Sequence, residues 1–208
     1  MAETKYKKRG STLTLGIILI ALIAISAYLI LSMDAAPEQE SEKGMVTTTE
    51  EVEQENSIDD EVAATTLIHA GDKAPDFTAE MLDGSSVTLS ALQNKPTLLI
   101  FWATWCPPCR AELAHLQEGV IDVFGDAINV LPLSRGEKRE VVEEYIAKMG
   151  YTFAVGLDSE QKAYNLYASN YIPRCFVIDT DGTVLYSGVG YDEAVAEEVN
   201  AKLREALK

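Results

Sequence analysis

Two cysteines separated by two residues have the types and spacing to carry out chemistry. They stand in the run Trp105-Cys106-Pro107-Pro108-Cys109, after an apolar stretch and at the start of a predicted helix, within disulfide reach of each other. Free backbone N–H groups and the positive end of the helix dipole stabilise a thiolate there. We therefore expect the pKa of Cys106 to fall below that of a free cysteine. A thiolate is the species that attacks a disulfide.

Two other uses of a Cys-x-x-Cys pair remain open from the residues. The pair could bind a metal, for which the remaining candidate ligands are Cys175, His69 and His115, although there is no second Cys-x-x-Cys motif. It could also be a purely structural disulfide, which a domain of this size does not need in order to fold. Dithiol redox chemistry is favoured, with Cys109 facing inward along the helix as the resolving thiol. We expect no metal and no cofactor.

Composition excludes several other classes of protein. The 208 residues carry 33 acidic and 17 basic side chains, for a formal net charge of -16. Such a balance disfavours nucleic-acid binding, because phosphates are neutralised by clustered Lys and Arg. Three cysteines and two histidines are too few for a disulfide-dense scaffold or for a zinc site built from several Cys and His.

The first 33 residues predict a membrane anchor. No charged residue stands between Arg9 and Asp34, and the apolar run 13–31 would be about 28 Å long as a helix, enough to cross a hydrocarbon core. Residues 1–10 are basic, so they are expected in the cytoplasm, with 11–33 as a single-pass anchor in the cytoplasmic membrane and the rest outside. A signal peptide cleaved near Ala24-Ile25-Ser26 remains the alternative.

Residues 34–66 predict a disordered acidic tether. Between Asp34 and Glu61 there are 11 acidic residues, one basic residue and no aromatic residue. A stretch of this kind cannot bury enough apolar surface to offset its chain entropy, and its charges repel one another.

Residues 67–208 have the length of one α/β domain. Its predicted strands are 77–81, 87–89, 97–102, 128–133, 175–178 and 184–187, with hairpin turns at Asp83-Gly84 and Asp181-Gly182. The predicted helices are 106 to about 124, 137–149 ending at Gly150, 160–167 and 194–207. The first of these helices is expected to bury Leu113, Leu116, Val120 and Val123, and the second Val141, Val142, Tyr145, Ile146 and Met149.

The segment 101–110, with the sequence FWATWCPPCR, resembles the active-site signature of the thioredoxin superfamily. More narrowly it resembles the membrane-anchored TlpA/ResA-type thiol-disulfide oxidoreductases, which border on the peroxiredoxin-like group. Support comes from the segment 71–77, from Ile172-Pro173 and from the segment 179–182. The resemblance implies a thioredoxin-like fold: a mixed central β-sheet flanked by helices, with an N-terminal β-hairpin extension, preceded by one transmembrane helix.

The resemblance also implies roles for single residues. Cys106 would be the attacking thiol and Cys109 the resolving one. Glu112, one helical turn after Cys109, would be partly buried beneath the dithiol and influence its protonation; an exposed Glu in a helix pair is the alternative. Pro173 would follow a cis peptide bond that exposes the Ile172 backbone to an incoming peptide strand.

Trp105, Ile172 and Pro173 are thus the expected substrate-binding residues.

Three positions depart from the pattern. Ile100 stands where thioredoxins carry a buried Asp, so an internal base must come from elsewhere, and Ala114 replaces a helix-kinking proline. Cys175 is expected to be a small buried core residue, with a third redox thiol as the alternative. His69 and His115 are expected to be structural or surface residues.

The favoured function is reduction of protein disulfides outside the cytoplasmic membrane, through a mixed disulfide to Cys106. The expected partners are cysteine-containing protein substrates and a membrane or exported electron donor. Haem-site cysteines of apocytochrome c are one substrate of the family, although nothing in this sequence selects them. A dithiol oxidase working in the opposite direction, a peroxiredoxin-like peroxidase and a non-enzymatic binding module are the alternatives.

Overall fold

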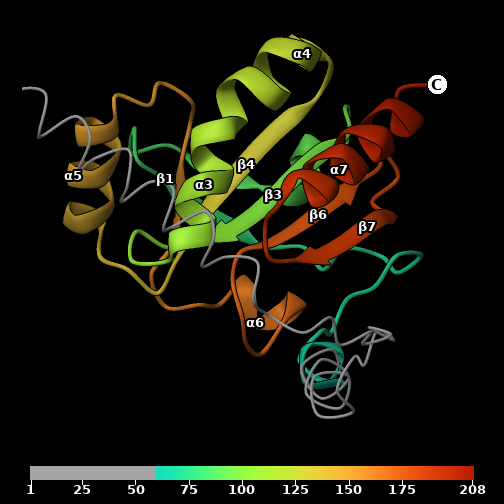
Figure 1. Cartoon of the computed structure of the whole chain (residues 1–208), viewed down its shortest axis with the longest axis horizontal. Helices are drawn as coiled ribbons and strands as arrows, with labels where there is room; N and C mark the ends of the chain where they lie inside the picture. The colour runs from blue at the N-terminus through green and yellow to red at the C-terminus, as the bar shows by residue number, and fades with distance from the viewer. Residues whose placement is uncertain (1–59) are drawn as a thin grey trace, which may run out of the picture. The chain divides into compact units, whose positions relative to one another are not determined.

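A computed structural model describes residues 60–208 of the chain (Figure 1). The predicted basic N-terminus, the membrane anchor and the tether up to residue 59 lie outside the described residues. Within 60–208, no helix has both the length and the apolar character needed to cross a membrane. Residues 60–66 were assigned to the end of the tether, but 60–64 form a helical turn and the next two residues bond to the domain.

The domain is built on one seven-stranded sheet with the strand order β2-β1-β5-β4-β3-β6-β7. The strands are β1 (Thr78–Met81), β2 (Ser86–Thr88), β3 (Thr97–Trp102), β4 (Asn129–Arg135), β5 (Gly156–Asp158), β6 (Arg174–Ile178) and β7 (Val184–Val189). The central strand β3 runs parallel to β4 and antiparallel to β6, and β5 is parallel to β4. The two predicted hairpins, β1–β2 and β6–β7, are both present. The mixed thioredoxin-like sheet is thereby confirmed.

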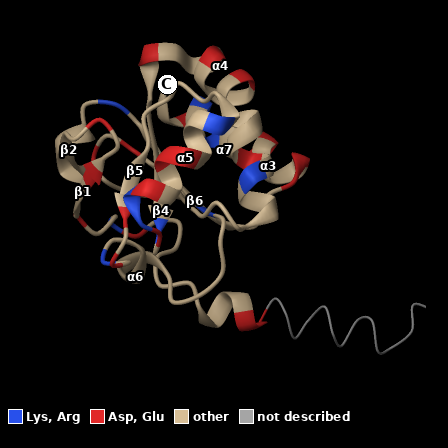
Figure 2. Cartoon of the chain, turned by 90° about the vertical axis from the view of Figure 1, so that its left-hand side faces the viewer, with Lys and Arg blue, Asp and Glu red and all other residues tan. Residues whose placement is uncertain are grey.

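The helical elements lie on both faces of this sheet. They are η1 (Leu89–Leu92), α3 (Pro107–Leu116), the π-helical turn η2 (Gln117–Ile121), α4 (Asp122–Phe124), η3 (Gly125–Ala127), α5 (Arg139–Met149), α6 (Tyr164–Tyr167) and α7 (Glu193–Ala206). Figure 1 shows α3 and α7 in front of the central strands, with α6 at the lower end of the molecule. Charged positions of both signs are scattered over these helices, which keeps their outer faces solvated (Figure 2).

Strand β3 divides the core into two halves. All six of its residues are buried, as expected for a strand covered on both faces. Ile100 and Trp102 pack in the cluster that includes residues of α3, α5 and α7. Phe101 points to the opposite face, where it contacts the rings of Tyr164 and Tyr167 from α6 at centroid distances of 5.4 and 5.5 Å.

Several predicted details differ from the structure. The helix expected to run from Cys106 to about 124 is interrupted by η2. A π-helical turn rotates the following residues off the apolar stripe, which leaves Val123 53% exposed. Helix α5 contacts the core through a narrower stripe than predicted, so Val141 and Met149 are about half exposed. Gly150 ends α5 in the left-handed conformation, as predicted.

The sequence prediction missed strand β5 and began α6 too early. β5 has only three residues and shows no periodic pattern, so its place in the sheet comes from pairing with β4 and β1. The predicted helix 160–167 is helical only from Tyr164, because Gln161 has a positive φ of 57° that an α-helix does not accommodate.

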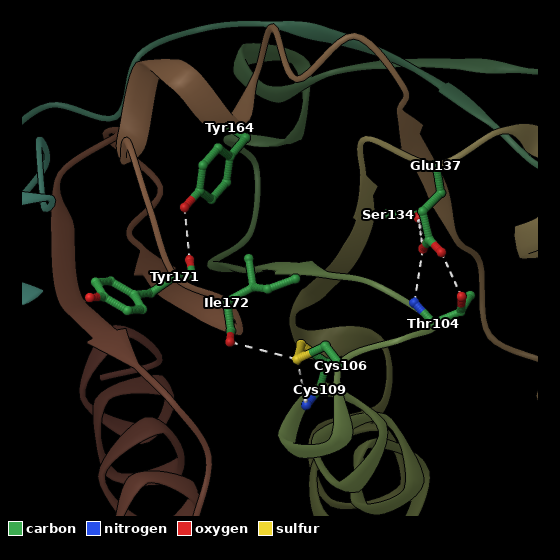
Figure 3. Close-up of a disulfide and its surroundings, with 8 residues drawn as sticks. All are labelled: Thr104, Cys106, Cys109, Ser134, Glu137, Tyr164, Tyr171 and Ile172. Carbon is green, nitrogen blue, oxygen red and sulfur yellow. Dashed lines mark hydrogen bonds between the residues drawn. A yellow bond between two sulfur atoms is a disulfide. The ribbon is translucent and has the colours of Figure 1, made fainter.

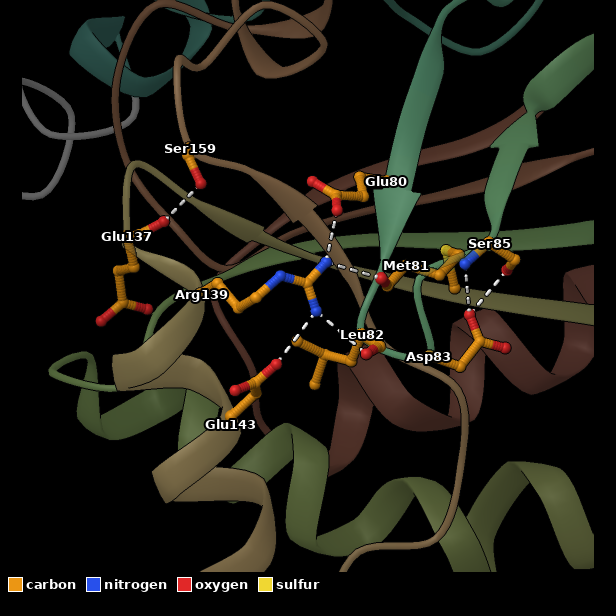
Figure 4. A network of polar contacts seen from close by, with 9 residues as sticks. All are labelled: Glu80, Met81, Leu82, Asp83, Ser85, Glu137, Arg139, Glu143 and Ser159. Carbon is orange, nitrogen blue, oxygen red and sulfur yellow. Dashed lines mark hydrogen bonds and ion pairs between the residues drawn. The ribbon is translucent and has the colours of Figure 1, made fainter.

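Arg139, the first residue of α5, ties that helix to the N-terminal hairpin (Figure 4). Its guanidinium donates to the carbonyl oxygens of Met81 and Leu82 at the end of β1, both at 2.9 Å. It also pairs with Glu80 at 2.7 Å and with Glu143 at 3.0 Å. These bonds fix the start of α5, and with it the preceding residues 134–138 that reach the functional site.

Candidate functional site

The two cysteines of the motif lie at the start of α3 and form a disulfide in the structure, with Cα atoms 5.3 Å apart. Cys106 is the residue before the first helical turn, and the Cys109 N–H donates to its sulfur across 3.3 Å. Pro107 and Pro108 fill the first two helical positions, where a missing N–H costs nothing. Cys106 is 3% exposed and Cys109 is fully buried. Because both prolines lack an N–H, the Cys109 N–H is the helix N-terminal donor that the described structure places on the sulfur of Cys106.

The chain before β6 brings Ile172, the residue before Pro173, opposite this disulfide (Figure 3). The peptide bond between them is cis, as the resemblance implied. The carbonyl oxygen of Ile172 lies 3.6 Å from Cys106 Sγ. Trp105, the residue before the dithiol, is 63% exposed. Cys109 and Ile172 thus contact the Cys106 sulfur, and Trp105 and Pro173 are the chain neighbours of Cys106 and Ile172.

Glu137 holds the loop that leads into the dithiol (Figure 3). Its carboxylate accepts hydrogen bonds from the Thr104 N–H at 2.8 Å, the Thr104 hydroxyl at 2.5 Å and the Ser134 hydroxyl at 2.9 Å. The Glu137 side chain is buried, and its own carbonyl oxygen accepts from the Ser159 hydroxyl at 2.6 Å. The carboxylate thereby fixes the backbone two residues before Cys106.

Glu112 lies in the core, one turn after Cys109 on the same helix. It is 7% exposed, and within residues 60–208 its Oε2 atom has no hydrogen-bond partner. Burial disfavours the charged carboxylate and raises the pKa of Glu112 to about 8. The exposed helix pair considered as the alternative is therefore not what the structure shows.

A small cavity of about 20 Å³ adjoins this acid. Glu112 and Ile100 both line it, together with His115 and Tyr191 at its outer side. The volume is enough for about one water molecule. Ile100 occupies the strand position where thioredoxins carry a buried Asp, so in this chain the buried acid reaches the same part of the core from α3 instead of from β3.

The remaining cysteine and the two histidines are not part of the dithiol site. Cys175 is fully buried in β6, and burial raises the pKa of its thiol well above the usual value, with smaller contributions from Glu112 and Glu198. His69 and His115 are exposed. Among residues 60–208 there is no cluster of three His, Cys, Asp or Glu side chains suited to a metal ion. The predicted core role of Cys175 is confirmed.

The structure brings the dithiol and the predicted residue Ile172 together and adds Glu137, which sequence reasoning missed. Sequence reasoning assigned Glu137 to the first turn of a helix, whereas α5 begins at Arg139. A signal was available in the strand order, because Thr104 follows β3 and Glu137 follows β4. The carboxyl ends of neighbouring parallel strands meet at the same edge of a sheet, which is where α/β proteins place their sites.

Comparison with known proteins decides the family. Residues 70–187 match the model of the AhpC/TSA family. The chain belongs to the AhpC/TSA family. A thiol-disulfide oxidoreductase ResA from Bacillus thuringiensis is 30% identical to this AhpC/TSA member over 138 residues, which cover 66% of this chain and 76% of the relative. The ResA of Bacillus subtilis is 29% identical over 118 residues, covering 57% of this chain and 66% of the relative.

Solved structures agree with these relatives. A thiol:disulfide interchange protein of the thioredoxin family from Chlorobium tepidum superposes with a TM-score of 0.57 at 26% identity, covering 66% of this chain and 97% of that one. The AhpC/TSA domain therefore has the thioredoxin-like fold, and the protein is an enzyme, a thiol-disulfide oxidoreductase.

Replacing Glu137 with Gln tests the support of the active-site loop. An amide offers one acceptor oxygen where three donors converge, so we expect Glu137→Gln to lower the free energy of unfolding by about 1–3 kcal/mol. Urea unfolding of the oxidised wild type and variant measures this change in the free energy of unfolding. Glu140→Gln, an exposed acid one turn away, is the matched control. Equal stability of the two variants would contradict the role of Glu137.

The raised pKa of Glu112 predicts a pH-dependent stability. Between its ordinary value of 4.5 and about 8, the folded protein keeps this proton and the unfolded chain has released it. Stability therefore falls as pH rises through this window, by at most about 1.4 kcal/mol per pH unit, and levels off above it. In Glu112→Gln this contribution is absent. Urea unfolding of both oxidised proteins at pH 5 and pH 8 checks it; parallel losses in both would contradict the burial of a proton at Glu112.

Proposed function

We propose that this oxidoreductase reduces disulfides of protein substrates outside the cytoplasmic membrane. The observation that carries the proposal is the placement of Cys106, whose sulfur accepts the Cys109 N–H at the start of α3 and faces the Ile172 carbonyl. Helix N-terminal N–H groups stabilise a thiolate at Cys106 in the reduced enzyme. The Ile172 backbone next to it supplies a polar edge along which an extended peptide can pair.

The reaction transfers two electrons in two exchange steps. The Cys106 thiolate attacks one sulfur of the substrate disulfide, forms a mixed disulfide and releases the other substrate sulfur as a thiolate. The Cys109 thiolate then attacks Cys106 Sγ, which forms the Cys106–Cys109 disulfide and releases the second substrate thiolate. The substrate ends as a dithiol and the enzyme as a disulfide, so a membrane or exported dithiol donor must reduce it again.

Glu112 is proposed to exchange a proton with the buried thiol of Cys109. Both side chains are buried, one helical turn apart, and the pKa of Glu112 near 8 matches the range in which thiols titrate. The small cavity beside Glu112 gives room for a water through which the proton can leave. Glu112 on α3 would thus take the role of the buried Asp that thioredoxins carry on the strand, where this chain has Ile100.

Membrane tethering belongs to the same proposal and is supported by the sequence. The basic residues 1–10, the uncharged run 11–33 and the acidic stretch after it suit a single-pass anchor with the catalytic domain on the outer side. Substrates there would include exported proteins whose cysteines must be kept reduced.

Trapping the intermediate tests the exchange mechanism. In Cys109→Ser the second step is blocked, so we expect a stable mixed disulfide between Cys106 and a protein substrate such as oxidised insulin, seen on non-reducing gels. Cys109→Ser with Cys175→Ala should trap equally well, because Cys175 is buried. Cys106→Ser should trap nothing.

Equilibration of the wild-type pair against a dithiothreitol buffer sets the direction. A potential near that of thioredoxin, about -270 mV, supports a reductase, and one near that of DsbA, about -120 mV, reverses the proposal. Peroxide consumption in place of insulin reduction would favour the peroxidase.

Titration of the thiols tests the role of Glu112. Above about pH 8 its carboxylate opposes a second negative charge nearby, so Glu112→Gln should lower the pKa of the Cys109 thiol in the reduced enzyme. An NMR titration of protein with ¹³Cβ-labelled cysteine reports this value for the buried thiol. Glu118→Gln, an exposed acid further along the same helical segment, is the control. Unchanged thiol pKa values in Glu112→Gln would remove the proposed role.

A further inference from the structure

In the loop 170–173, three of the four carbonyl oxygens accept hydrogen bonds from N–H or O–H groups of the domain. The Asn170 oxygen accepts from Arg174 Nε at 3.2 Å and from Nη2 at 2.9 Å. The Tyr171 oxygen accepts from the Tyr164 hydroxyl at 2.7 Å (Figure 3), and the Pro173 oxygen accepts from the Gly190 N–H at 2.9 Å. Within residues 60–208, Ile172 has the one carbonyl of this loop that no N–H or O–H group reaches. It faces Cys106 Sγ.

Arg174 is an unusual support for this loop. Its side chain is fully buried, and no carboxylate of the described part of the chain forms an ion pair with it. Besides Asn170, its guanidinium donates to the hydroxyl oxygens of Thr66 at 2.6 Å and Thr65 at 2.8 Å. A buried cation without an anion is costly, so its position depends on these neutral oxygen atoms.

Residues 65–68, which we call the N-terminal strap, run beside this loop. Thr66 pairs with Ala168 in an antiparallel bridge. The Leu67 N–H donates to the Tyr167 oxygen at 3.0 Å, and the Ser169 N–H donates to the Thr65 oxygen at 2.9 Å. The strap is therefore connected to the loop that carries Ile172 through the hydrogen bonds of Arg174.

We propose that Arg174 and Tyr164 are positioning residues that hold the Ile172 carbonyl opposite Cys106, and that the N-terminal strap completes this support by supplying the oxygen atoms that fix Arg174. The proposal rests on the proposed function in one respect, namely that the Ile172 backbone pairs with the substrate peptide. Its consequence is specific: losing the strap's hydrogen bonds to Arg174 weakens docking of protein substrates and leaves the chemistry of the dithiol unchanged. The strap residues and Tyr164 do not touch the reacting sulfur atoms.

Two kinds of substrate separate docking from chemistry. Pre-reduced protein is mixed with increasing oxidised insulin, which offers a peptide strand, or with the small disulfide DTNB, which offers none. The double variant Thr65→Val with Thr66→Val removes two hydrogen bonds to Arg174, and Tyr164→Phe removes the bond to the Tyr171 oxygen. For each we expect the half-saturating insulin concentration to rise about five-fold. The rate with DTNB and the pKa of Cys106 should stay as in the wild type.

Ser187→Ala is the matched control, because the Ser187 hydroxyl bonds the same strap at Ile68 O, away from Arg174. It should lose stability in urea without a change in half-saturation. Equal effects on insulin and DTNB, or equal half-saturation in the control and the strap variants, would overturn the proposal.

Failure of the proposed function gives a different result. Wild-type protein that reduces DTNB and leaves insulin untouched would refute reduction of protein disulfides. The positioning role is then decided by hydrogen exchange of the backbone amides of Tyr171, Ile172, Arg174 and Cys175. Faster exchange in the strap variants than in Ser187→Ala supports it, and equal exchange refutes it.

Discussion

The site depends on the chain changing direction within four residues, between Trp102 at the end of β3 and Pro107 at the start of α3. The strand is buried on both faces and cannot shift, and the helix begins where the two prolines allow it. Cys106 therefore lies at a fixed point at the N-terminus of α3, where its sulfur accepts the Cys109 N–H. The other features of the site hold this turn or use it: Glu137 fixes its backbone from the loop after β4, and Ile172 approaches it from the side of β6.

The two faces of the sheet carry different parts of the site. On the face covered by α3 and α7, the dithiol, Glu112 and the small cavity are buried together. Proton and electron transfer therefore take place on that face. On the opposite face, Tyr164 and Arg174 support the loop that meets the substrate. The redox chemistry and the substrate-binding loop therefore depend on different sets of residues, and Ile172 joins the two because it packs against the clusters on both faces.

Local patterns account for what the sequence could predict. β3 is a continuous apolar run, the hairpins have Asp-Gly turns, and the dithiol motif is short, so each is encoded by adjacent residues. Glu137 binds Thr104, which is 33 positions away, and Arg174 binds Thr66, which is 108 positions away. No local sequence pattern predicts contacts over such distances. Strand β5 was not predicted for the same reason, because its three residues form a strand only through pairing with β1 and β4. The partial burial of Glu112 was implied by the resemblance, whereas the cavity that it lines together with Ile100 required the structure.

The burial of Cys175 has a consequence for how the protein is made. Three cysteines allow three single disulfides, and two of those would join Cys175 to one member of the working pair. In the folded sheet Cys175 is paired in register with Ile100 on one side and Gly188 on the other, and it is out of reach of oxidants. In the unfolded chain all three thiols compete. The order of sheet formation and oxidation therefore decides whether a newly made chain becomes an enzyme or a misbridged product.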